Sequence, residues 1–307
     1  MALGVLNNLS AIYAENNLNN TNNSLQNVLQ QLSSGSRINS GADDAAGLSL
    51  VNGLQANSKA LTQSATNATE GVGLLQVADG ALSQVTNLLN RAVTLATEAS
   101  NGTLNSSQGA AADQEYKSIL AEISNIGSTT TYNQNQVFTG SALGISIYTG
   151  DSSAAGASLD VLYFAGLSSS SVGDAGGSIT YTPAAGGVPA TITYTPVANA
   201  ANQIDLSGTD LTTNANAQAA LTNLNLAITD VAAQDGYIGA QINTLNSISQ
   251  VMSTQQDNIV SAQNAIQATD YASATSNMSK YEILSQTGIA ALAQANSVEQ
   301  EVTKLLQ

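Results

Sequence analysis

Apolar residues recur at intervals of seven in three long parts of the chain. In the C-terminal part, five successive positions keep this interval without a slip. The positions are Leu18, Leu25 and Leu32; Leu74, Ala81, Leu88 and Leu95; and Ile238, Leu245, Met252, Ile259 and Ile266. A strict period of seven predicts long helices that supercoil around one another. The alternative is an ordinary amphipathic helix in a globular bundle.

The middle of the chain has a different pattern. All three prolines lie between residues 183 and 196, and short β-branched and aromatic runs alternate there with Gly, Ser and Pro. The pentapeptide ITYTP occurs at 179–183 and again at 192–196. This repeat predicts a β-hairpin in which each proline closes a strand. The simplest interpretation of this small β module is a surface decoration without a site.

Both ends of the chain carry apolar rows on weakly amphipathic helices. The positions flanking the apolar seams are mostly Asn, Gln, Ser and Thr, so such helices bury little apolar area and are marginal alone. We therefore expect the ends to fold fully against each other or against neighbouring copies. The predicted fold is mainly α, with long N- and C-terminal coiled-coil helices in an elongated bundle and a small central β-rich insertion.

Composition excludes several kinds of chemistry. The 307 residues contain no Cys and no His, and 21 acidic residues against 6 basic ones give a formal charge of −15. Thiol, imidazole and zinc-based catalysis are thereby removed, and no basic surface exists for nucleic acid. A glycosidase built on Asp151, Asp160 and Asp174 is the enzymatic alternative, but their spacing gives no reason to expect paired carboxyls. We expect no enzyme, cofactor or metal.

The first twenty residues do not read as a cleaved secretion signal. They lack a basic start and a continuous apolar stretch, and nowhere does an apolar run approach the ~20 residues that cross a bilayer. The expectation is a protein without a membrane segment that is cytoplasmic or exported without a cleaved signal.

The stretch LSSGSRINSGADDAAG, residues 32–47, raises the choice between a catalytic acid pair and a connector. Gly35 suits the left-handed position after a helix, and Asp43 and Asp44 suit the start of the next helix. Gly41 keeps the connection slim. We expect Arg37 to pair with Asp43, Asp44 or an acid of a neighbouring copy, which makes the stretch a connector.

Three stretches together resemble bacterial flagellin: residues 32–47, LLNRAVTLATEASNGT (88–103) and DYASATSNMSKYEILSQTGIAALAQANSV (270–298). The resemblance implies three layers. Residues 1–43 and 270–307 form an inner coiled-coil core that orders on assembly. Residues 44–140 and 209–269 form a helical bundle with a β-hairpin near 129–138, and 141–208 is a variable surface domain.

The resemblance also implies function and partners. The chain is expected to polymerise into the flagellar filament for swimming, after unfolded export through the flagellar type III apparatus, and so to be secreted and extracellular. A hook–filament junction protein is the alternative. Expected partners are further copies, the export apparatus, a cytoplasmic flagellin chaperone, and filament cap and hook-associated proteins. The residues expected to serve the chaperone and polymerisation are Ile283, Leu284, Leu292, Val298, Val302 and Leu305.

Two smaller correspondences complete the resemblance. Arg91, Leu95 and Glu115 match the surface that animal Toll-like receptors detect in many flagellins, which makes such a receptor a further expected partner. The family's hairpin turn QFNG reads Thr131, Tyr132, Asn133, Gln134 here. Without glycine, Asn133 or Gln134 must adopt a positive φ, and Asn tolerates it better.

Overall fold

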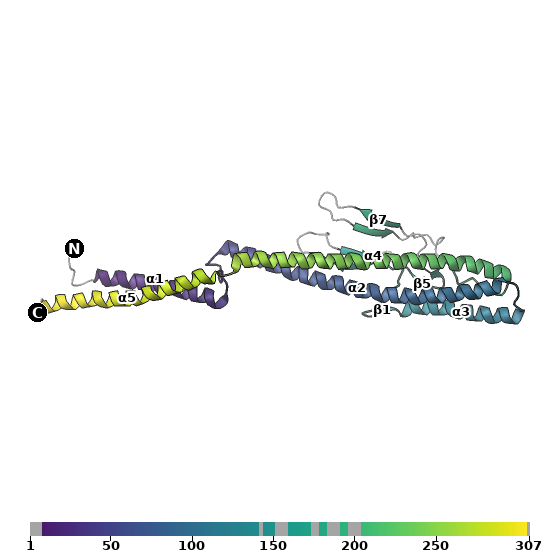
Figure 1. The fold of residues 1–307 in the computed structure, drawn as a ribbon, viewed down its shortest axis with the longest axis horizontal. Helices are drawn as coiled ribbons and strands as arrows, with labels where there is room; N and C mark the ends of the chain where they lie inside the picture. The colour runs from purple at the N-terminus through teal and green to yellow at the C-terminus, as the bar shows by residue number, and fades with distance from the viewer. Residues whose placement is uncertain are drawn as a thin grey trace. The chain divides into compact units, whose positions relative to one another are not determined.

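A computed structural model describes residues 8–140, 144–150, 159–172, 178–182, 191–195 and 204–305. Long helices dominate these residues, and short strands occupy the middle, which confirms the mainly helical prediction. The helices are α1 (Leu9–Ser34), α2 (Ala45–Ser100), α3 (Ser106–Thr129), α4 (Asn214–Gln267) and α5 (Tyr271–Leu305) (Figure 1). None of them is both long enough and apolar enough to cross a bilayer.

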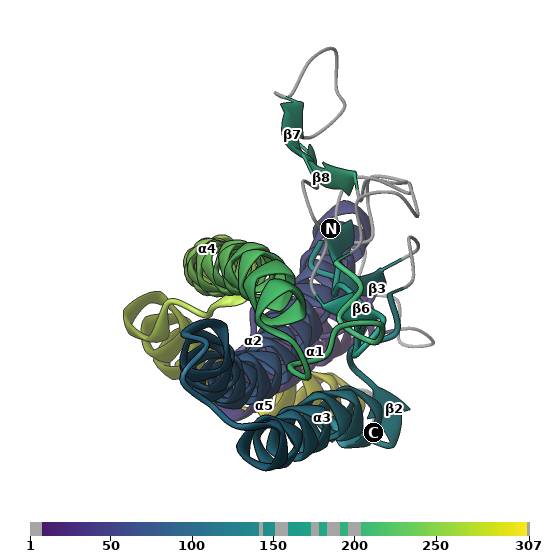
Figure 2. The ribbon, with the colours of Figure 1, turned by 90° about the vertical axis from the view of Figure 1, so that its right-hand side faces the viewer.

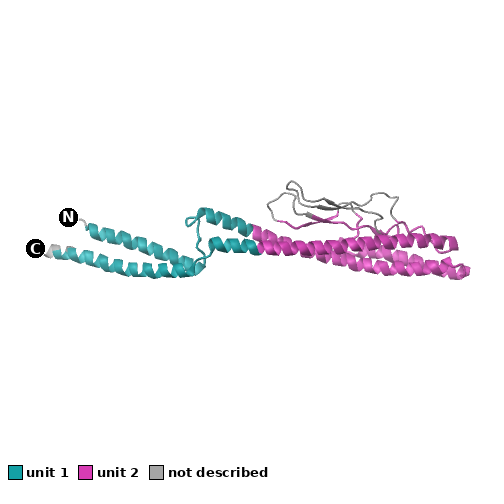
Figure 3. Cartoon of the chain, turned by 45° about the horizontal axis from the view of Figure 1, so that its top comes forward, with its two compact units in different colours: residues 1–56, 257–307 teal, residues 57–256 magenta. Residues whose placement is uncertain are grey.

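The chain divides into two compact units (Figure 3). Unit 1 contains residues 1–56 and 257–307, and unit 2 contains residues 57–256. The predicted division placed boundaries at 43/44 and 269/270, at the connectors between helices. The observed boundaries instead fall inside α2 and α4, because each of these helices runs unbroken through both units.

In unit 1, helix α1 lies antiparallel to α5. Asn8 Nδ2 donates to the Ala295 carbonyl at 3.0 Å, and Ser285 Oγ donates to Asn22 Oδ1 at 3.1 Å. Helix α1 begins where the Asn8 side chain accepts from the Ala11 amide, and it ends at Gly35. Along the seam, Val28 is buried, whereas the three heptad leucines of α1 are only half-buried: Leu18, Leu25 and Leu32.

Unit 2 packs α2, α3 and α4 around one apolar core. Figure 2 shows the ribbon in a view nearly along these helices. Helix α3 begins with a reciprocal capping box between Asn105 and Gln108. The heptad positions of this unit are buried or packed against the core: Leu74, Leu88, Leu95, Ile238 and Leu245. Of the remaining α4 positions, Met252 is buried, while Ile259 and Ile266, which belong to unit 1, are half-buried.

Short strands form two-stranded antiparallel pairs in the described part of the middle. The strands are β1 (Thr131–Tyr132), β2 (Asn135–Gln136), β3 (Ile145–Tyr148), β4 (Leu159–Leu162), β5 (Leu167–Ser168), β6 (Ser171–Val172), β7 (Ser178–Thr182) and β8 (Thr191–Thr195). Each pairs with its neighbour in sequence. The β7–β8 pair, in the register Thr182 to Thr191, confirms the hairpin predicted from the ITYTP repeat. Pro183 and Pro196 themselves lie outside the described residues.

Hairpin β1–β2 falls within the predicted range 129–138. Its turn residues Asn133 and Gln134 have φ values of 49° and 65°. Both residues have a left-handed backbone conformation. From the sequence we expected a positive φ at only one of the two and favoured Asn133 for it. Two successive left-handed residues are what the tight primed turns of two-residue hairpins require.

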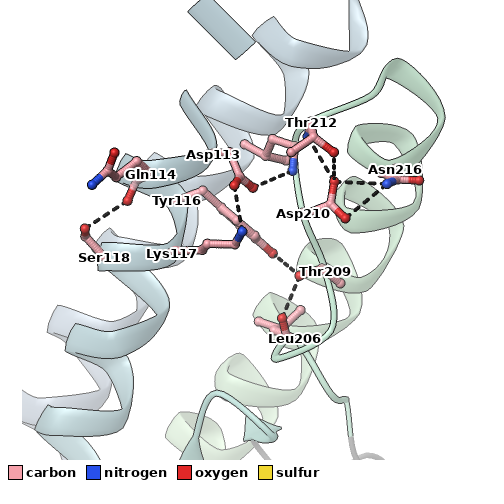
Figure 4. Close-up of polar contacts among 11 residues, drawn as sticks. Asp113, Gln114, Tyr116, Lys117, Ser118, Leu206, Thr209, Asp210, Thr212 and Asn216 are labelled. Atoms are coloured by element: carbon pink, nitrogen blue, oxygen red, sulfur yellow. Dashed lines mark hydrogen bonds and ion pairs between the residues drawn. The ribbon is translucent and has the colours of Figure 1, made fainter. Parts of the chain in front are cut away.

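The β module is more than the surface decoration expected for residues 141–208. Several of its described apolar side chains belong to the core of unit 2 and are buried: Ile147, Leu162, Phe164, Val172 and Leu206. Hydrogen bonds to α3 hold the segment that leads into α4 (Figure 4). Asp113 on α3 accepts from the Leu211 amide at 2.9 Å, and the Tyr116 hydroxyl lies 2.5 Å from Thr209 Oγ1. Deleting 141–208 would therefore remove part of the core.

Candidate assembly site

The connector between α1 and α2 starts at a glycine that both geometry and packing require. Gly35 has φ 71°, and its amide donates to the Gln31 carbonyl at 2.9 Å, which closes the last turn of α1. A Cβ at this position would lie 2.9 Å from the Tyr271 hydroxyl oxygen. The predicted left-handed cap is thus confirmed, and α5 approaches it closely.

A second connector, between α4 and α5, pairs with the first. Ser36 and Ala268 form an antiparallel bridge, the Arg37 amide donates to the Gln267 carbonyl at 2.7 Å, and the Thr269 amide donates to the Gly35 carbonyl at 3.1 Å. The two connectors therefore form one small two-stranded element within unit 1. We call residues 35–44 together with 266–270 the joint.

Arg37 strengthens the joint in a way that the sequence did not predict. Its Nη2 donates to the carbonyl of Ile266, near the C-terminal end of α4, at 2.9 Å. A cation is favourable there because the last carbonyls of a helix carry partial negative charge. The expected pairing of Arg37 with Asp43 or Asp44 within the chain is wrong: Asp43 accepts from amides of its own connector, and Asp44 accepts from an amide in the first turn of α2.

Asp43 and Asp44 shape the start of α2. Asp43 Oδ2 accepts from the amides of Asn39 and Ser40 at 3.0 and 2.8 Å, and these bonds hold the pKa of Asp43 below its usual value. Asp44 Oδ1 accepts from the Gly47 amide at 2.8 Å and caps the helix, as predicted. A Cβ at Gly41 would meet only Leu48, at 3.9 Å, so nothing in the structure requires glycine there.

Sequence reasoning missed several residues of this region. Ile38 is buried beneath the connector, and a Cβ at Gly47 would lie 2.8 Å from its Cδ1 atom. Asp270 Oδ1 accepts from the Ala272 and Ser273 amides at 3.0 and 3.2 Å, which caps α5. An acid before a long helix was a readable capping signal. The close approach of Ile38 to Gly47 had no sequence signal.

Apolar side chains stand exposed on α1 and α5. Of the fifteen large apolar residues that are exposed among the described ones, eleven belong to unit 1. On α5 they are Ile283, Leu284, Ile289 and Val298. Leu292 is half-buried, and the side chains of Val302 and Leu305 lie outside the described residues. A groove of about 610 Å³ also runs between α1 and α5, bordered by Leu18, Tyr281 and Leu284.

The three residues matched to a receptor surface do not share one face. Arg91 Nη2 lies 2.7 Å from Glu115 Oε1, and both side chains are about half exposed. Leu95, however, is 4% exposed and belongs to the core of unit 2. The expectation that Leu95 forms part of a receptor surface is therefore wrong for this structure, because the same side chain fills the heptad seam.

The carboxylates considered for catalysis do not form a described pair. Asp151 and Asp174 lie outside the described residues. Burial raises the pKa of Asp160, whose Oδ2 is buried and has no hydrogen-bond partner among the described residues. No group of three metal-ligating side chains occurs within the described ranges.

Comparison with known proteins assigns the family. The model of the bacterial flagellin N-terminal helical region matches residues 5–142, and that of the C-terminal helical region matches residues 221–306. Together the two matches cover more than half of the chain. The chain belongs to the flagellin family. Residues 143–220, which contain most of the β module, fall outside both matches.

Named flagellins match nearly the whole chain. The flagellin of Listeria monocytogenes is 29% identical over 303 residues, which is 97% of this chain and 98% of the relative. The flagellin of Halalkalibacterium halodurans is 29% identical over 300 residues, 98% of each chain. The crystal structure of Bacillus cereus flagellin is similar with a TM-score of 0.44 and 24% identity, covering 64% of this chain and 94% of that one, a likeness too weak to add to the assignment.

These flagellin matches give the protein its role as a structural subunit of the extracellular flagellar filament, which serves motility. No finding favours the hook–filament junction alternative.

Proposed function

We propose that unit 1 is the self-assembly surface of this filament subunit, and that the exposed faces of α1 and α5 become buried against neighbouring copies. The observation that carries the proposal is the concentration of exposed apolar side chains in unit 1. Contact between unlike surfaces of successive copies does not close and generates a filament. Burial of each such side chain contributes roughly 1–2 kcal/mol.

The joint gives these helices a defined starting geometry. Backbone bonds of Arg37 and Thr269 join the two connectors, and the Arg37 side chain adds a bond to Ile266, so α1 and α5 leave the joint as an antiparallel pair. We propose that residues 1–43 and 270–307 line the filament core in this arrangement. Residues 44–140 and 209–269 would form the surrounding layer, and the β7–β8 part of 141–208 would face solvent.

We further propose partners that act before assembly. An exposed apolar face on α5 needs covering in the monomer, so residues 270–307 would bind a cytoplasmic flagellin chaperone. Export through the flagellar apparatus as an unfolded chain is compatible with the absence of Cys, since no disulfide can form on the way. The filament cap and hook-associated proteins would contact unit 1 at the two ends of the polymer. A host Toll-like receptor remains a proposed partner only through the exposed Arg91 and Glu115.

The proposal is tested by changing one exposed apolar residue in each unit. Ile283 is 60% exposed in unit 1, and Leu226 is 52% exposed in unit 2. We expect Ile283→Ser to lengthen the lag and reduce the filament yield about tenfold in seeded polymerisation, scored by sedimentation and negative-stain microscopy. Leu226→Ser is the matched control and should assemble normally. Equal filament yields from the two variants would place the assembly surface elsewhere.

A further inference from the structure

A groove in unit 2, lined by both apolar and polar side chains, is not used by the assembly surface. Its volume is about 390 Å³, and its walls come from α2, from hairpin β1–β2 and from β3. The side chains with polar or aromatic chemistry on these walls are Asn67, Glu70, Tyr132, Asn133, Asn135, Ser146 and Tyr148. This volume lies within the range of about 300–1,000 Å³ that small-ligand sites occupy.

Two glycines on α2 shape the groove. A Cβ at Gly71 would collide with the side chain of Ile147 on β3, and a Cβ at Gly73 would lie 3.4 Å from the Tyr132 hydroxyl. Glycine weakens a helix interior, and the collision at position 71 explains its presence there, whereas the distance at position 73 is an ordinary contact. Both β elements therefore lie directly on α2, and the groove runs between them.

The residues that line the groove have two roles: one holds β3 against α2, and the others can contact a ligand. Asn67 Nδ2 donates to the Tyr148 carbonyl at 3.0 Å, and Asn67 Oδ1 accepts from Gln63 Nε2 at 2.9 Å, so this amide fixes β3 against α2. Within the described ranges, no hydrogen bond engages the side chains of Glu70, Asn133 or Asn135.

Asn133 is held in place by the turn. Its positive φ, with that of Gln134, sets the direction of the hairpin tip beside the groove. A non-glycine residue in this conformation carries strain, and such strain persists where the surrounding structure over-determines it. Asn133 is thus placed beside the groove by the two-residue turn of hairpin β1–β2.

We propose that this groove binds a neutral carbohydrate. Two amides and a carboxylate can each accept from, or bridge, adjacent hydroxyl groups, and tyrosine rings offer apolar faces with a polar edge to the C–H side of a sugar ring. Tyr148 is 43% exposed and supplies such a ring at the rim. No basic residue lines the groove and Glu70 is acidic, so phosphorylated, sulfated or carboxylated ligands are disfavoured.

The test uses the full chain as a monomer and saturation-transfer NMR. Lactose, maltotriose and chitotriose are the neutral probes, and sialyllactose is the anionic counterpart of lactose. We expect saturable transfer from the protein to at least one neutral sugar at millimolar concentration, and weaker transfer to sialyllactose. Absence of saturable binding for all three neutral sugars would overturn the proposal.

Variants locate the binding. Tyr148→Ala should weaken the affinity about tenfold, while Tyr13→Ala, which removes a tyrosine that is 63% exposed on α1, should leave it unchanged. Far-UV circular dichroism checks folding, and Glu70→Ala on the exposed surface of α2 replaces Tyr148→Ala if that variant misfolds. Unchanged affinity in the groove variants would contradict the proposed site.

Seeded polymerisation of the same variants separates this proposal from the assembly model. If Tyr148→Ala binds sugar poorly and still forms normal filaments, the groove is a ligand site independent of assembly. If the wild-type chain binds no sugar and Tyr148→Ala fails to polymerise, the groove is a contact between copies and the carbohydrate proposal is wrong.

Discussion

The two units of this filament subunit differ in how completely the apolar side chains of their helix seams are buried. In unit 2, helix–helix seams are filled by side chains such as Leu75, Leu245 and Ile238, which are completely buried. In unit 1, the α1 leucines Leu18 and Leu25 are only half-buried although they follow the same seven-residue repeat. The repeat therefore predicts which face of a helix packs, but it does not predict how completely one chain covers that face.

This difference assigns a task to each unit. Unit 2 has a third helix, α3, and strands of the β module that close its core, so it is complete within one chain. Unit 1 pairs two helices and leaves apolar side chains outside the pair. A helix pair with an uncovered apolar face has marginal stability in water. In the proposed assembly, neighbouring copies cover this face and stabilise the pair.

Truncating one seam leucine in each unit should give the largest difference in the free energy of unfolding between the two units. Leu245→Ala removes a fully buried side chain of unit 2 and should lower the free energy of unfolding by about 3 kcal/mol. Leu18→Ala, at a half-buried position facing Gly288, should cost about 1 kcal/mol in the monomer. Urea denaturation followed by circular dichroism measures both values. Equal losses would mean that unit 1 is as well packed as unit 2.

The joint offers a smaller perturbation that separates folding from assembly. Arg37→Ala removes one hydrogen bond at an exposed site and should change monomer stability by no more than about 1 kcal/mol. It should reduce filament yield substantially, because the direction of α1 and α5 is set there. Lys59→Ala, another exposed basic residue, is the control for charge. Normal filament length and yield from Arg37→Ala would count against the joint.

Acid provides the mildest test of the joint. The folded-state pKa of Asp43 lies below its ordinary value of 3.8, because amides of Ser40 and Asn39 donate to the ionised form. These bonds therefore stabilise the joint fully above that ordinary value and weaken as the pH falls through the lowered pKa. The protection of the Asn39 and Ser40 amides, measured by NMR as their exchange relative to the intrinsic rate at each pH, should decrease below pH 4 in the wild type. Asp43→Asn should show fast exchange at neutral pH, and slow exchange there would contradict this account.

Much of the fold was readable from the sequence because its signals are local or periodic. The seven-residue repeats predicted α2 and α4, the ITYTP repeat predicted β7–β8, and Gly35 and Asp44 predicted the ends of the connector. Each of these features depends on residues that are close in sequence.

What the sequence did not predict depends on contacts between distant segments. Arg37 bonds to Ile266, 229 residues away, and no spacing rule connects them. Leu95 matched a receptor motif, yet the same side chain fits the heptad seam and is buried there. The core role of Leu162 and Leu206 was missed because a short strand and a loop in a Gly- and Ser-rich region carry no sequence signal for packing against distant helices.

Hydrogen–deuterium exchange, compared between monomer and filament, tests the central claim most directly. If unit 1 is completed by neighbouring copies, amides of α1 and of α5 will exchange rapidly in the monomer and become strongly protected in the filament. Amides of the buried seam of α2, residues 74–96, will be protected in both states. Strong protection of α1 and α5 already in the monomer, with no further gain on assembly, would contradict the account.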